Sequence, residues 1–117
     1  MKAFIISLSI VLALFILTAL NSIFVNYTVS SLIEQAQSLH IGDDSVKKFA
    51  NTWNEKQFFI RLSSSHEETH KIVEAVKVLE AKVQEGNASG FYEERALLVE
   101  YLTQILEDEA ISFENII

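Results

Sequence analysis

The chain has 117 residues with nine basic and sixteen acidic side chains; half of its residues are hydrophobic, and it contains neither cysteine nor proline. This length allows one domain with an anchor, and the absence of cysteine excludes disulfides, thiolate metal sites and lipid attachment through cysteine. All acidic residues and eight of the basic ones follow residue 33, so residues 34–117 carry a net charge of −8, which argues against binding to nucleic acid or to anionic lipid through this region.

The first segment, Ala3 to Leu20, contains no charge, and twelve of its eighteen residues are Phe, Ile, Leu or Val. Placed in a bilayer, these twelve side chains contribute about −4 to −7 kcal/mol, which outweighs the cost of two serines and one threonine. Eighteen helical residues span about 27 Å, close to the thickness of the hydrocarbon core. We therefore predict a single transmembrane helix within residues 1–25.

A cleaved signal peptide is the alternative interpretation of this segment. Its apolar stretch is longer than an ordinary signal-peptide core, and the best small-residue cleavage pattern, Val29 with Ser31, lies about ten residues too far along the chain. Lys2 is the only charged residue before Glu34, so the positive-inside rule predicts a cytoplasmic N-terminus and an extracytoplasmic domain over residues 26–117.

The remainder of the chain is predicted to be all-α, because its apolar residues recur at helical spacing rather than in alternation. Gly42, Gly86 to Gly90, and the serines before His66 interrupt the pattern, and Ser65 with Glu68 has the spacing of a capping box. The predicted helices cover about 22–39, 45–62, 66–85 and 91–107. The predicted core positions are Val25, Val29, Leu32, Ile33, Ala36 and Leu39 in the first helix, Val46, Phe49, Ala50, Trp53, Gln57 and Ile60 in the second, Ile72, Val76, Leu79 and Val83 in the third, and Phe91, Leu98, Tyr101, Leu102 and Ile105 in the fourth.

Helices with one apolar face must pair, and short connections favour antiparallel neighbours. We therefore expect a small antiparallel bundle or stacked helical hairpins. A domain of this size buries only a modest fraction of its surface in a core, so self-association or a partner helix would add stability. Phe58 and Phe59, which follow Trp53 on the second helix, fit a wider core face, which we expect, or an exposed contact surface.

The sharpest chemical motif is His66-Glu67-Glu68-Thr69-His70, which matches H-E-x-x-H. On a helix, two histidines four residues apart can bind zinc while the glutamate acts as a general base, but a third protein ligand is needed. The candidates are His40, Glu93 and Glu94. The alternative is a solvated first helical turn with acidic residues at its positive end. We favour this alternative, and no catalytic residue, cofactor or small-molecule substrate is indicated elsewhere.

The order of these features resembles a known family. An anchor is followed by a tryptophan-bearing helix, a His66-Glu67 pair opening the next helix, a helix rich in Glu and Leu, and a closing Ile111-Ser112-Phe113-Glu114-Asn115-Ile116-Ile117. This arrangement is similar to a family of small single-pass membrane proteins of spore-forming Gram-positive bacteria, known only as a domain of unknown function. The resemblance implies membrane attachment and a helical extracytoplasmic domain, and it implies no activity. His66 and Glu67 match the pattern of this family, whereas His70 does not.

Three hypotheses follow. The first is a non-enzymatic interaction or structural module that is anchored in the membrane and binds another membrane or envelope protein, or a second copy, with sporulation as one setting. The second is a zinc metallopeptidase centred on His66, Glu67 and His70. The third is a cleaved and secreted helical protein.

Overall fold

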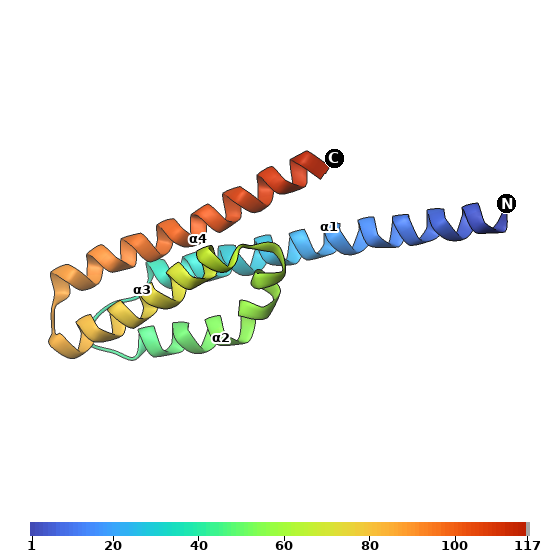
Figure 1. The fold of residues 1–117 in the computed structure, drawn as a ribbon. Coiled ribbons are helices and arrows are strands. Elements are labelled where there is room, and N and C mark those ends of the chain that lie inside the picture. Colours follow the sequence, from blue (N-terminus) through green and yellow to red (C-terminus); the bar gives the residue numbers. More distant parts are fainter. Residues whose placement is uncertain (117) are drawn as a thin grey trace.

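The computed structural model describes the backbone of residues 1–116 and the side chains of residues 1–62 and 64–109. The chain forms four helices, α1 (Lys2–Gln37), α2 (Ser45–Ser63), α3 (His66–Glu85) and α4 (Ala88–Ile116), and the described residues contain no strand (Figure 1). The predicted all-α class is confirmed.

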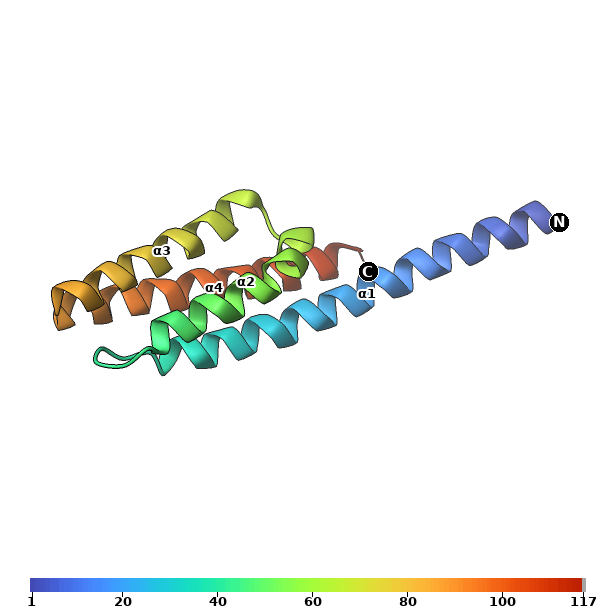
Figure 2. The same ribbon diagram turned by 90° about the horizontal axis from the view of Figure 1, so that it is seen from below.

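The helices form an antiparallel four-helix bundle in which each helix packs against two others. The contacts run from α1 to α2, from α2 to α3, from α3 to α4 and from α4 back to α1. Only the C-terminal half of α1 belongs to the bundle, and its N-terminal half projects alone (Figures 1 and 2), so the molecule measures 69 × 23 × 21 Å. We call the end where α1 leaves the bundle the exit end; it also holds the α2–α3 connection. The far end holds the other two connections.

Local sequence explains where the helices begin and end. Ser65 caps α3, because its hydroxyl oxygen accepts a hydrogen bond from the backbone N–H of Glu68 at 3.2 Å, as the capping-box spacing predicts. At the other end of α3, Gly86 has a left-handed conformation with φ of 68°, which lets the N–H groups of Gly86 and Asn87 bond to the carbonyls of Val83 and Lys82. These caps place the turn between α3 and α4 at Gly86 and Asn87.

The core extends along the whole bundle and consists of the predicted apolar faces. Among the described side chains, seventeen hydrophobic residues are buried. They are Val25, Val29, Leu32, Ala36 and Leu39 of α1 and its end, Val46, Phe49, Trp53 and Ile60 of α2, Ile72, Ala75, Val76 and Leu79 of α3, and Phe91, Leu98, Leu102 and Ile105 of α4. Ile33, Ala50, Val83 and Tyr101 pack against this core while partly buried. Helical periodicity therefore identified most of the core, but Gln57, a predicted core position, is only partly buried, and Ala75 is buried without having been predicted.

α4 is longer than predicted. α4 begins at Ala88 instead of 91, because Asn87 caps it: its side-chain oxygen accepts from the N–H of Gly90 at 3.0 Å, and its carbonyl accepts from Phe91 at 3.0 Å. It also continues to Ile116 instead of 107, since no glycine or proline follows Gly90 to end it. α1 passes residue 25 without interruption. The side chains of the closing motif, 111–117, lie outside the described residues.

Candidate membrane anchor and bundle surfaces

The N-terminal half of α1, which projects from the bundle and which we call the apolar rod, is not covered by the other helices. Its most apolar eighteen-residue stretch has none of its residues buried, and large side chains such as Phe4, Leu12 and Leu17 are 57 to 70% exposed. The hydroxyl of Thr18 donates to the carbonyl of Leu14 at 2.8 Å, so this polar group is satisfied within the helix. A membrane span requires this length and composition, and an N-terminal signal sequence has the same properties.

Phe58 and Phe59 lie at the exit end and are exposed. Their side chains are 63% and 41% accessible, and Leu62, one turn further along α2, is 63% accessible. The expectation of a wider core face at these positions is therefore wrong. Trp53 and Ile60 already fill the core side of this part of α2, which leaves the two phenylalanines on its outer side.

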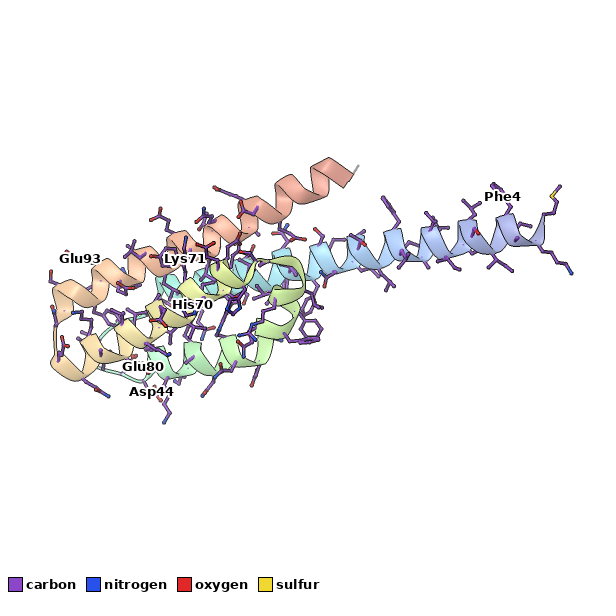
Figure 3. The ribbon with its side chains drawn as sticks, in the orientation of Figure 1. Phe4, Asp44, His70, Lys71, Glu80 and Glu93 are labelled. Carbon is purple, nitrogen blue, oxygen red and sulfur yellow. The ribbon has the colours of Figure 1, made fainter. Side chains whose placement is uncertain are left out.

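The histidines of the H-E-x-x-H motif occupy the first turns of α3 on its exposed surface. Their rings stack with centroids 6.1 Å apart, and Nε2 of His70 lies 3.8 Å from a carboxylate oxygen of Glu74. Figure 3 shows His70 and Glu93 well separated along the bundle. Glu93 and Glu94 belong to the first turns of α4 at the far end, where Lys82 lies beside Glu94.

His40 also lies at the far end, in the α1–α2 connection, where its Nε2 pairs with Asp43 at 2.5 Å. None of the three candidate third ligands is therefore brought to the two motif histidines. Within residues 1–109, no group of three or more histidine, aspartate or glutamate side chains is placed to hold a metal ion. His66, Glu67 and His70 are exposed on this turn, whereas Thr69 is buried.

The structure instead singles out Glu68, the second of the two acidic residues between the histidines. Its Oε2 atom is buried and has no donor among the described residues. The pKa of Glu68 is raised to about 7, first by burial and then by the nearby carboxylate of Asp108 on α4, while Lys71 and the Ser65 hydroxyl act in the opposite direction. Protonated Glu68 can donate to Asp108, which satisfies the buried oxygen. Glu68 and Asp108 face each other because α3 and α4 form an antiparallel hairpin that turns at Asn87. Helical periodicity describes each helix separately, so it did not predict this pair.

Arg95 is a second residue that periodicity did not find. Its Nη1 donates to the carbonyl of Leu39 at 2.8 Å, which connects α4 to the residues that follow α1, and its guanidinium lies 4.8 Å from the centre of the Tyr92 ring. The last carbonyls of a helix lack partners within the helix. The Leu39 carbonyl, just beyond this helix end, also has no helical partner, and Arg95 satisfies it and so ties α4 to the α1–α2 connection at the far end.

A groove of about 390 Å³ opens at the far end between the start of α2 and the end of α3. Asp44 and Glu80, labelled in Figure 3, are among its walls. The pKa of Asp43 is lowered, mainly because its carboxylate accepts a hydrogen bond from the backbone N–H of Ser45 at 2.9 Å, so this group remains charged. The groove therefore has three carboxylates against one ammonium. Its lining residues are Asp43, Asp44, Val46, Lys47, Glu80, Val83 and Gln84.

Comparison with known proteins adds the family. Residues 22–116 match the family described as domain of unknown function DUF4363. The match begins where α1 enters the bundle, so it covers the bundle and leaves out the apolar segment before it. No curated protein and no solved structure matches the chain. Because the match covers most of the sequence, the protein belongs to the DUF4363 family.

Proposed function

We propose that this protein is a single-pass membrane protein whose helical bundle binds another protein of the membrane or envelope on the extracytoplasmic side. The observation that carries the proposal is the projecting half of α1. A helix with large apolar side chains exposed on all sides is costly in water, at about 25 cal/mol for each Å². A bilayer removes this cost without any change to the bundle.

Retention of this helix, rather than its removal as a signal peptide, is supported by the packing of α1. The best small-residue pattern would place a cut after Ser31. Such a cut would remove Val25, Thr28 and Val29, all of which are buried in the bundle. Sequencing the N-terminus of the mature protein tests this point, and a start within residues 20–32 would favour the secreted alternative.

The orientation is proposed from charge. Lys2 precedes the apolar stretch, whereas the first basic residue after it is Lys47, beyond three acidic side chains. The positive-inside rule then leaves the N-terminus in the cytoplasm and the bundle outside.

We infer binding rather than catalysis because the candidate metal ligands are separated in the bundle, whereas a groove lies open at its far end. In the proposed arrangement this end is the most distant from the membrane. Its charged lining suits a basic segment of a partner protein, with Val46 and Val83 supplying apolar contact. This feature suggests electrostatic selection of the partner.

Site-specific photocrosslinking in membranes tests the proposal. A benzophenone side chain at Gln84, in the groove, should yield a discrete crosslinked product with a partner or a second copy, whereas the same probe at Lys77, exposed on α3 outside the groove lining, should not. Glu80→Lys should reduce the product from Gln84 if charge selects the partner. Recovery of uncrosslinked monomer alone from both positions would contradict the proposal.

A further inference from the structure

The exit end carries an unusual set of exposed apolar side chains on one side of the bundle. We name Phe24, Phe58, Phe59 and Leu62 the apolar collar. Phe24 of α1 is 39% exposed, and its ring meets that of Phe59 edge-on with centroids 5.0 Å apart. The ring of Phe58 meets Phe59 in the same way at 5.6 Å. The collar is therefore one connected surface shared by α1 and α2.

This surface continues the apolar rod. Phe24 lies four residues beyond Leu20, about 6 Å further along the helix axis, and Ile23 beside it is 66% exposed. Figure 2 shows the α2–α3 connection next to the point where α1 leaves the bundle. If residues 3–20 fill the hydrocarbon core, the collar lies at the depth of the lipid headgroups and the adjoining acyl chains. Aromatic residues concentrate at this depth in membrane proteins.

The charge around the collar agrees with such a position. Residues 56–66 include Lys56 and Arg61 but no acidic residue, although the chain has sixteen. Arg61 is exposed and can extend to lipid phosphates. The opposite side of the exit end carries Glu67 and the Glu68–Asp108 pair, which suit water. Among the described side chains of this end, those on the α2 side are therefore the ones compatible with the bilayer surface, and a modest tilt of α1 would bring them there.

We propose that the apolar collar inserts into the interfacial layer of the same bilayer that α1 spans, so that the C-terminal end of α2 sits in the membrane surface and the bundle does not stand free of it. This inference rests on the proposed membrane anchor. The contact is apolar in origin, which makes it independent of the net charge of −8 on residues 34–117. It would fix the height and orientation of the far-end groove relative to the membrane.

Lipid quenching of tryptophan fluorescence in the full chain tests this inference. Each of three variants adds one tryptophan at an exposed position: Phe58→Trp in the collar, Leu97→Trp on α4 and Phe15→Trp in the rod. Trp53, buried in the core, supplies a background measured on the unsubstituted chain. The proteins are placed in neutral phosphatidylcholine vesicles whose acyl chains are brominated either near the headgroup or near the bilayer centre.

The expected result is strong quenching of Phe58→Trp by shallow bromine, strong quenching of Phe15→Trp by deep bromine, and no quenching of Leu97→Trp. Quenching of Phe15→Trp without quenching of Phe58→Trp would overturn the collar proposal and leave the anchor intact. The absence of quenching at both positions would overturn the anchor and the collar together. A blue-shifted, unquenched Phe58→Trp that depends on the protein-to-lipid ratio would show a second copy on the collar and would also overturn the proposal.

Discussion

Replacement of Glu68 by glutamine should stabilise the bundle at alkaline pH, although it removes a charged residue from the first turn of α3. The folded protein holds a proton on Glu68 up to a pH of about 7, whereas the unfolded chain releases it near the ordinary pKa of 4.5. Between these values the folded state binds more protons than the unfolded state. The contribution of Glu68 to stability therefore falls as the pH rises through this range, and its full cost is present above pH 7.

The magnitude follows from the same two values. The interval from 4.5 to about 7, at about 1.4 kcal/mol for each pH unit, sets a ceiling of about 3.5 kcal/mol. Glu68 shares its surroundings with Asp108 and part of its side chain reaches solvent, so we expect a gain of about 1 to 2 kcal/mol for Glu68→Gln at pH 8. The amide of glutamine can donate to Asp108 without titrating.

The assay is chemical unfolding of the full chain in detergent micelles, followed through the fluorescence of Trp53, the only tryptophan. The gain of Glu68→Gln over the unsubstituted protein should be largest at pH 8 and disappear near pH 5. Glu67→Gln is the matched control, because it removes an exposed charge from the same helical turn. A difference between Glu68→Gln and the parent that is constant across this range, or a loss of stability at pH 8, would refute the reasoning.

Three further predictions concern stability, each measured in the same unfolding assay. Leu98→Ala should cost about 2 to 5 kcal/mol because Leu98 is fully buried, whereas the neighbouring Leu97→Ala should cost less than about 1 kcal/mol; equal losses would contradict the core. Arg95→Ala should cost about 1.5 to 3 kcal/mol through the hydrogen bond to the Leu39 carbonyl, and an effect no larger than that of the exposed Arg61→Ala would argue against this bond. Ser65→Ala should cost about 0.5 to 2 kcal/mol as the loss of the α3 cap, with Ser64→Ala as the control, and no difference between the two would remove the capping assignment.

Much of the bundle was predictable because its helices follow local rules. Helical spacing placed Val29, Phe49, Leu79 and Leu102 in the core, and Ser65 with Glu68 marked the start of α3. The extent of α4 was harder to predict, because Asn87 resembles a loop residue in sequence yet caps a helix that has no later breaker.

The remaining features depend on how the helices lie beside one another. Arg95 and Leu39 are 56 positions apart, and Glu68 meets Asp108 only in the register of the α3–α4 hairpin. Hydrophobicity does not distinguish a core face from an exposed apolar face, so Phe58 and Phe59 could not be assigned from their residue type. The motif at residues 66–70 suggested zinc from spacing alone, but a third ligand has to come from the fold.

The central claim, a bundle held outside the membrane by the N-terminal half of α1, is tested most directly by labelling a single cysteine in intact cells. The chain has no cysteine, and Ser89 is exposed at the far end, so Ser89→Cys provides one reactive site. We expect the full-length protein to stay in the membrane fraction after alkaline carbonate extraction and to react with a membrane-impermeant maleimide before lysis. Release of the full-length chain into the carbonate supernatant, or labelling only after lysis, would contradict this claim.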